Sequence, residues 1–206
     1  MKLVICGSPL QPVNPLRYPV EGNRTIEYEG EVRFPVNAVL AKTMKRGEPV
    51  KVILIVTKGG TSDSEENTGV FQSELNRINE KTGAILHCDT LELPFEPTKN
   101  TFDLFLSDLI KKIPNNADII VDITYGMKPT VLPLFCALNF AEKFCNASIQ
   151  NIIYGKAEKN KQTGKMTENP KIFDVTHLFY LNKLIGTMEC PDAETAKKIL
   201  GDFFAL

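Results

Sequence analysis

The feature that most constrains this chain is a regular alternation of short apolar runs with segments of helical period. Near-continuous apolar runs of this length are typical of strands that are covered on both faces. Six runs are expected to form strands: KLVIC (2–6), KVILIVT (51–57), AILHC (84–88), DIIVDIT (118–124), SIQNIIYG (148–155) and KIFDVTHL (171–178).

The segments between the first five runs place apolar residues at helical spacing. The first segment follows Pro35, a favoured first-turn residue, and the second ends at Gly83. The last is apolar nearly all round, so we expect it to be the most buried helix. The four helices are expected over 36–44, 71–78, 102–113 and 131–145.

This order predicts an α/β fold, a Rossmann-like and mostly parallel sheet with helices on both faces. The last two strands are joined by the polar segment 156–170, which contains four lysines. It predicts an antiparallel edge hairpin with a solvated loop that makes no ligand contact. We expect one Rossmann-like domain over 1–178 and one or two closing helices over 179–206.

Composition excludes several classes of protein. The 24 basic and 25 acidic residues give a net charge of -1, which argues against a non-specific coat on duplex nucleic acid. No apolar run approaches the roughly 18–20 residues that span a bilayer, so no membrane partner is expected. The five cysteines are widely spaced and the two histidines lie far apart. We therefore expect reduced thiols in the cytoplasm and no metal site.

The common nucleotide motifs of this architecture are missing. The turn after the first strand reads Gly7-Ser8-Pro9-Leu10, without the GxGxxG of dinucleotide-binding proteins. The sequence also lacks a P-loop and the HExxH and GxSxG motifs. We therefore expect no cofactor.

The connection from Cys6 to Phe34 is far longer than the usual two to six residues. This length indicates a functional loop, and a disordered insertion is the alternative. Its polar residues include Ser8, Asn14, Arg17, Asn23 and Arg24.

A second candidate loop follows the fourth run, where Thr124-Tyr125-Gly126-Met127-Lys128 leads into the apolar helix. Ligands of open α/β sheets bind outside the carboxyl ends of the strands. A helix start and a lysine together favour an anion. The alternative is a plain turn in which Thr130 caps the helix and Lys128 lies in water.

Two more positions near these strand ends are candidates. Asp122 lies in an apolar run and should be hydrogen-bonded to loop backbone, as a structural brace rather than a catalytic acid. The end of the second run, with Thr57 and Gly59, could line the same crevice or only turn the chain.

The segment DIIVDITYGMKPTVLPLFCALNFAE (118–142) resembles the Asp-[Ile/Val]-Thr-x-Gly-[Phe/Met]-[Arg/Lys] signature of CARF domains, the CRISPR-associated Rossmann folds. YEGEVRFPVNAVL (28–40) and KVILIVT (51–57) are also similar to that family. Tyr125 departs from the His or Asn that often follows the Thr. The resemblance implies binding of a cyclic oligoadenylate, the second messenger of type III CRISPR systems. With neighbouring loop residues, the expected ligand-binding set is Gly7, Ser8, Pro9, Thr57, Gly59, Thr124, Tyr125, Gly126, Met127 and Lys128.

The resemblance leaves two functions open. One is a homodimeric sensor whose two-fold symmetry matches a cyclic tetra-adenylate and which signals to an effector domain or protein. The other is a ring nuclease, in which Ser8, Thr124 and Lys128 would assist metal-independent attack by a ribose 2′-OH. A third interpretation is a Rossmann-like domain that binds a mononucleotide or a protein. Residues 179–206 leave no room for a catalytic effector, so we expect it to lie elsewhere.

Overall fold

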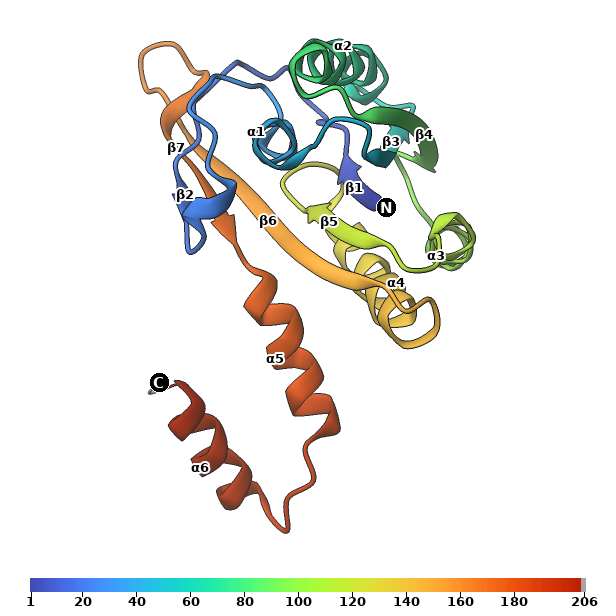
Figure 1. Ribbon diagram of the computed structural model, residues 1–206, viewed down its shortest axis with the longest axis vertical. Helices are drawn as coiled ribbons and strands as arrows, with labels where there is room; N and C mark the ends of the chain where they lie inside the picture. Colours follow the sequence, from blue (N-terminus) through green and yellow to red (C-terminus); the bar gives the residue numbers. More distant parts are fainter. Residues whose placement is uncertain (205–206) are drawn as a thin grey trace. The chain divides into compact units, whose positions relative to one another are not determined.

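The computed structural model describes residues 1–204, which form an α/β fold around one mostly parallel sheet (Figure 1). The strand order is β2-β7-β6-β5-β1-β3-β4, and β6 and β7 form the antiparallel pair. The predicted fold class is therefore confirmed. The strands are β1 (Lys2–Gly7), β2 (Val20–Glu21), β3 (Pro49–Lys58), β4 (Ile85–Pro94), β5 (Asp118–Asp122), β6 (Ser148–Lys159) and β7 (Met166–Asp174).

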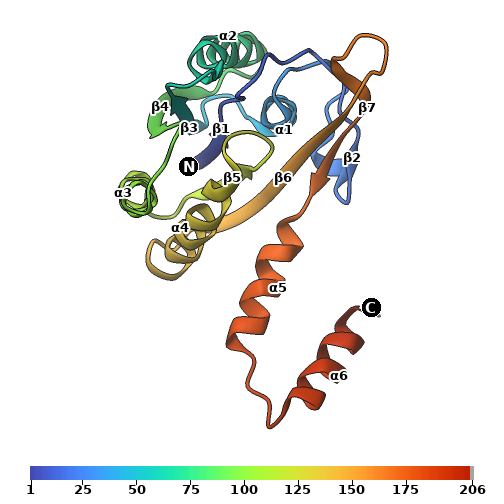
Figure 2. The same ribbon diagram turned by 180° about the vertical axis from the view of Figure 1, so that it is seen from behind.

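Helices cover both faces of the sheet. The pair α1 and α2 lies on one face and the pair α3 and α4 on the other (Figures 1 and 2). The expected starts and stops are largely confirmed, since α1 begins at Pro35 and Gly83 ends α2 with a positive φ of 70°. The helices are α1 (Pro35–Thr43), α2 (Ser64–Thr82), α3 (Lys99–Lys112), α4 (Val131–Phe144), α5 (Thr176–Thr187) and α6 (Ala193–Phe204).

The most buried helix is α1 and not α4, contrary to the sequence-based expectation. Six consecutive residues of α1, from Pro35 to Leu40, are buried between the sheet and α2. In contrast, α4 packs against α3 and β6 and leaves Leu132 and Phe144 exposed by 74% and 64%. An apolar composition therefore did not indicate burial on all sides of this helix.

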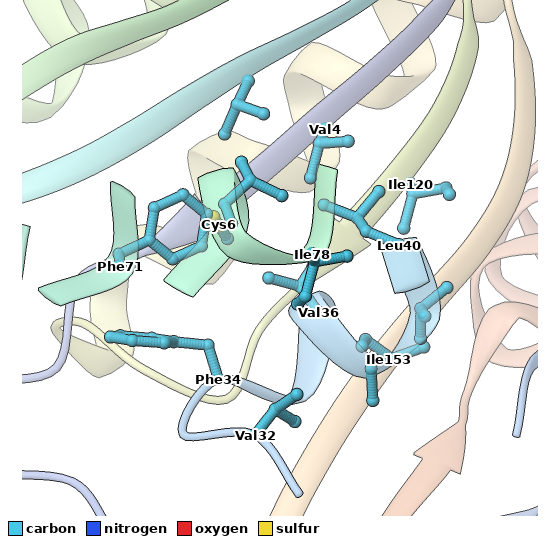
Figure 3. Packing of buried hydrophobic residues seen from close by; sticks show 14 of the residues in the cluster. Val4, Cys6, Val32, Phe34, Val36, Leu40, Phe71, Ile78, Ile120 and Ile153 are labelled. Carbon is cyan, nitrogen blue, oxygen red and sulfur yellow. The ribbon is translucent and has the colours of Figure 1, made fainter. Parts of the chain in front are cut away.

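The main core cluster lies between α1, α2 and the sheet (Figure 3). Residues from α1 and α2, such as Leu40 and Phe71, pack against Val4 and Ile120 of the central strands. Phe34 meets Phe71 edge to face, with ring centroids 5.1 Å apart. This packing fixes the central strands whose carboxyl ends meet at the candidate site.

The long connection after β1 is an ordered part of the fold, so the alternative of a disordered insertion is wrong. It buries Tyr18, Val20 and Ile26 in the main core. Its β2 strand pairs with β7 and extends the sheet beyond the expected edge hairpin. Leu16 and Val32 form an isolated antiparallel bridge that closes the loop on itself.

The β6–β7 hairpin is longer than expected. Both strands continue into the polar segment 156–170, and only residues 160–165 form the turn. The last strand ends at Asp174, where the carboxylate accepts the Thr176 N–H at 3.1 Å. Residues Thr176, His177 and Leu178, predicted to be in the strand, therefore belong to α5.

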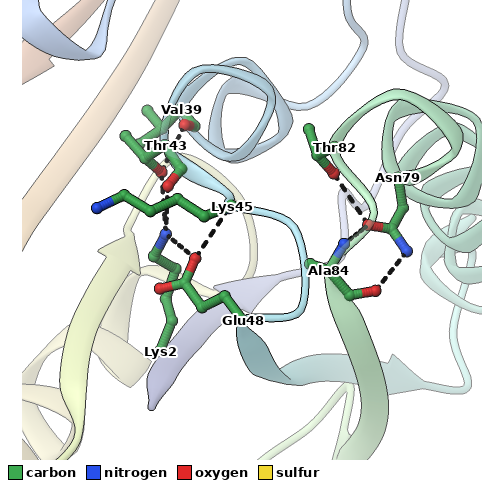
Figure 4. Close-up of polar contacts among 8 residues, drawn as sticks. All are labelled: Lys2, Val39, Thr43, Lys45, Glu48, Asn79, Thr82 and Ala84. Carbon is green, nitrogen blue, oxygen red and sulfur yellow. Dashed lines mark hydrogen bonds and ion pairs between the residues drawn. The ribbon is translucent and has the colours of Figure 1, made fainter.

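The amino ends of the strands are held by polar contacts (Figure 4). The Lys2 ammonium donates to the Thr43 carbonyl oxygen at 2.7 Å and to the Glu48 carboxylate at 3.1 Å. The Asn79 side chain donates to the Ala84 carbonyl at 2.9 Å and accepts from its N–H at 2.8 Å. These contacts stabilise the end of the sheet opposite the candidate site.

The chain divides into two compact units, residues 1–176 and 177–206. The boundary predicted from the sequence was two residues later, after residue 178. The second unit consists of α6 and nearly all of α5, and α6 buries none of its residues. Within residues 1–204, no helix has the length and apolar character needed to cross a membrane.

Candidate functional site

The candidate site lies where the carboxyl ends of β1 and β5 meet. These two strands are parallel neighbours, and β1 also pairs with β3 on its other side. Apart from the two-residue β2 at the far edge, the strands that follow β1 are added first on one side, as β3 and β4, and then on the other, as β5 and β6. The switch point of the sheet therefore lies between β1 and β5. Ligands of doubly wound sheets bind at such a switch point.

A cavity of about 400 Å³ opens at this point. Three segments that are far apart in the sequence build its wall. They are the proline-rich start of the long loop, the loop after β5 and the β6–β7 hairpin. The lining comprises residues 9–14, Leu16, Tyr18, residues 124–126, residues 154–157 and Met166.

Gly7 allows the first two segments to approach each other. A β-carbon at Gly7 would lie 2.3 Å from the Tyr125 carbonyl oxygen, closer than nonbonded atoms can come. Gly126 has a φ of 100°, a conformation that other residues rarely adopt, and faces the Gly7 Cα. Gly7 therefore shapes the cavity by close backbone packing and is not among the lining residues.

Asp122 braces the floor of the site, as expected from its apolar surroundings. Its side chain is buried, and its two oxygens accept the Thr124 N–H at 2.8 Å and the Val36 N–H at 3.0 Å. Burial raises the pKa of this carboxyl to about 6, although hydrogen bonds from Thr124 and Val36 oppose the shift. The carboxylate thereby connects the loop after β5 to the start of α1.

Thr124 connects the same loop to β6. Its hydroxyl oxygen accepts the Gly155 N–H at 2.6 Å. Gly155 has no room for a side chain, because a β-carbon there would lie 2.3 Å from Pro35. Thr124 and Gly155 both line the cavity, so this hydrogen bond fixes the position of one wall relative to another.

Two tyrosines line the inner part of the cavity. Tyr125 donates from its hydroxyl to the Arg33 carbonyl at 3.2 Å, and its ring lies edge-on to Phe34. Burial raises the pKa of Tyr18 to about 12 and raises that of Tyr125 further. Both phenols are therefore neutral at physiological pH and can serve as hydrogen-bonding groups but not as bases.

Ser8 and Thr57 are buried and do not line the cavity. Ser8 is fully buried, and its hydroxyl donates to the Ser64 carbonyl at 2.7 Å. The Thr57 N–H donates to the Ser64 hydroxyl at 2.9 Å. Both residues hold the start of α2, so the candidate role of Ser8 in catalysis lacks access to the cavity.

Three further predicted residues, Gly59, Met127 and Lys128, also lie outside the lining. Lys128 begins a short 3₁₀ helix over Lys128–Thr130 and is exposed. The Thr130 hydroxyl donates to the Met127 carbonyl at 2.6 Å and does not cap α4. The structure thus gathers Pro9, Thr124, Tyr125 and Gly126 from the predicted set.

Sequence reasoning missed the contribution of the β6–β7 hairpin. The polar segment 156–170 was expected to stand apart, yet Lys156, Ala157 and Met166 line the cavity. Tyr154 precedes them on β6 and also lines it. The sequence held one signal for this contribution. The apolar run SIQNIIYG (148–155) continues directly into KAEK (156–159), so the strand can extend past its buried part.

The charge of the lining favours an anion. Among the lining residues within 1–204, Lys156 is the one with a full charge, and none is an aspartate, glutamate or histidine. In the same described part of the chain, no group of three or more His, Cys, Asp or Glu side chains could hold a metal ion. The arrangement is suited to binding an anionic ligand that carries an aromatic ring.

No protein-family model matches this chain, and the curated proteins compared with it give no match either.

Proposed function

We propose that this chain is a sensor domain that binds a cyclic oligoadenylate in the cavity between the loops after β1 and β5. The observation that carries the proposal is the position of this cavity at the β1/β5 switch point, with Thr124, Tyr125 and Gly126 in its wall. These residues belong to the segment 118–142, which resembles the CARF signature. The proposal places the protein in cytoplasmic type III CRISPR signalling.

Size and charge support this ligand. A volume of about 400 Å³ lies near the lower end of the range for small-molecule sites. Such a cavity suits one nucleotide unit, and two copies related by a two-fold axis would hold opposite units of a symmetric ring. Lys156 in a wall without carboxylates suits the phosphodiester of such a unit.

Sensing is favoured over cleavage of the ring. Ser8, a candidate for assisting 2′-OH attack, is fully buried and bonded to Ser64. The tyrosines of the inner wall stay protonated, so they cannot take a proton from the ribose near neutral pH. A binding module that passes a signal to a separate effector needs neither group.

The test is to incubate the protein, without added metal, with cyclic tri-, tetra- and hexa-adenylate and to analyse bound and free ligand by mass spectrometry. We expect one ring to co-elute with the protein and to stay intact. Co-elution of none of the three would contradict the proposal. Linear products that accumulate with protein concentration would show that the chain is a ring nuclease instead.

A further inference from the structure

The outer wall of the cavity is formed by one strand that the family resemblance does not include among its binding positions. Tyr154 and Lys156 lie two residues apart on β6, so both side chains are on the same face of the strand. Both line the cavity. This spacing places an aromatic ring and a cation next to each other along one wall.

Tyr154 is held in place but not covered. Its ring stacks with that of Phe173, the residue directly opposite on β7, at a centroid distance of 6.4 Å and an angle of 26°. It remains 42% exposed. A partly exposed, supported aromatic ring at a cavity wall can stack a nucleobase, because every base has a flat face.

Lys156 has only weak internal partners. It lies opposite Lys171 in the strand register, and like charges at such positions disfavour strand pairing. Its ammonium forms an exposed ion pair with Glu158 at 3.2 Å, a kind of contact that contributes little to stability. Lys171 is paired with Glu21 at 3.4 Å, so an anion bound beside Lys156 would compete with the exposed Glu158 alone for its ammonium.

We propose that Tyr154 and Lys156 are the residues that recognise one nucleotide unit, with the base stacked on Tyr154 and a phosphate beside Lys156. This inference rests on the proposed function for the identity of the ligand. It assigns the main phosphate contact to the hairpin wall and not to Lys128, which is exposed and outside the lining. The β6–β7 hairpin is then part of the recognition surface.

The experiment compares affinities by calorimetric titration with cyclic tetra-adenylate and with adenosine 5′-monophosphate, a single nucleotide unit. The cation is tested by Lys156→Ala, with Lys128→Ala as the rival position and Lys161→Ala, in the hairpin turn, as the matched control. We expect at least about a tenfold loss for Lys156→Ala, and a change within about twofold for the other two variants. The affinity of Lys156→Ala should also depend less steeply on salt concentration.

The ring is tested by Tyr154→Leu, which keeps an apolar side chain, and by Tyr154→Phe, which keeps the ring. We expect Tyr154→Leu to lose about five- to a hundredfold in affinity and Tyr154→Phe to bind nearly as the parent. The chain has no tryptophan and five tyrosines, three of which line the cavity. Tyrosine fluorescence therefore reports binding in the cavity, and the part of its change that comes from Tyr154 should be lost in Tyr154→Leu.

The outcomes separate the two proposals. If the monophosphate binds with this pattern of losses and the cyclic ligand does not, the cyclic oligoadenylate function is wrong and the recognition by Tyr154 and Lys156 stands. A second outcome is that the parent binds the cyclic ligand, and that Lys156→Ala and Tyr154→Leu bind it as tightly as the Lys161→Ala control does. In that case the recognition proposal is overturned and the function stands. Binding of neither ligand overturns both.

Discussion

Gly7 and Tyr125 are in backbone contact, so that a β-carbon on Gly7 would lie 2.3 Å from the Tyr125 carbonyl oxygen. Gly7 is held by its pairing with Ile55 of β3, and the loop that carries Tyr125 is held by the hydrogen bonds of Asp122 and Thr124. This contact joins the two loops that follow the central strands. Any side chain at position 7 must therefore push the loop after β5 away from the loop after β1.

We expect Gly7→Ala to lower the free energy of unfolding by roughly 1–3 kcal/mol, the usual cost of forcing an extra carbon into a packed site. Ligand affinity should fall as well, since the cavity walls shift. Gly69→Ala is the matched control, because Gly69 lies in the exposed part of α2 with nothing within 4 Å of its would-be β-carbon. That change should raise stability by roughly 0.5–1 kcal/mol. Urea denaturation measures the free energy of unfolding of both variants. An equal change in the two would contradict the close backbone contact at Gly7.

Asp122 should make stability depend on pH. Burial raises its folded-state pKa to about 6, above the value of 3.8 for a free carboxyl. Between these two values the folded chain holds a proton that the unfolded chain has released. The stabilising contribution is therefore full below about pH 3.8 and is lost as the pH rises through about 6.

The test is to compare the unfolding free energies of the parent and Asp122→Asn from pH 3.5 to 7. Asparagine does not titrate, so the stability of the parent relative to the variant should decrease by roughly 3 kcal/mol across this range. Parallel curves would contradict the raised pKa and indicate that the carboxyl titrates alike in the folded and unfolded chain.

Ser8→Ala separates a structural role from a role at the ligand. The variant loses the buried hydrogen bond to the Ser64 carbonyl, so we expect the free energy of unfolding to fall by roughly 1 kcal/mol. Affinity for cyclic tetra-adenylate should change by less than about threefold, because a residue outside the lining adds little to binding. A large loss of affinity at unchanged stability would instead place this hydroxyl at the ligand.

The exposed apolar side chains of α4 are the expected contact of a homodimer. Leu132, Cys136, Phe140 and Phe144 repeat every four residues along one side, and two of them are more than 60% exposed. Sedimentation should give a mass near twice 23.0 kDa. The double change Leu132→Glu and Phe144→Glu should give a monomer, whereas Leu104→Glu on α3 should not. A parent that stays monomeric at every concentration would remove the two-fold site.

The fold could be predicted from the sequence because its main strands are apolar runs that are easily recognised. The run KVILIVT is apolar on both faces and became the buried part of β3. Helix stops were equally readable, since Gly83 adopts the positive φ that ends α2. These signals are local, and each is decided by the chemistry of a few neighbouring residues.

The site was only partly predictable, because its walls depend on contacts between distant segments. The loop after β5 was found from its strand end, and Thr124, Tyr125 and Gly126 line the cavity. Ser8 looked equally suitable, yet its hydroxyl turns to Ser64, 56 positions away. From the sequence, Lys156 resembled a solvated lysine. It reaches the cavity because β6 is extended by its pairing with β7, and the local sequence does not show that pairing.

The central claim is that each cavity holds part of one cyclic oligoadenylate shared by two chains. Calorimetric titration of cyclic tetra-adenylate into the unmodified protein measures affinity and stoichiometry together. We expect saturable binding with one ring per two chains. Absence of binding for the tri-, tetra- and hexa-adenylate rings would contradict it.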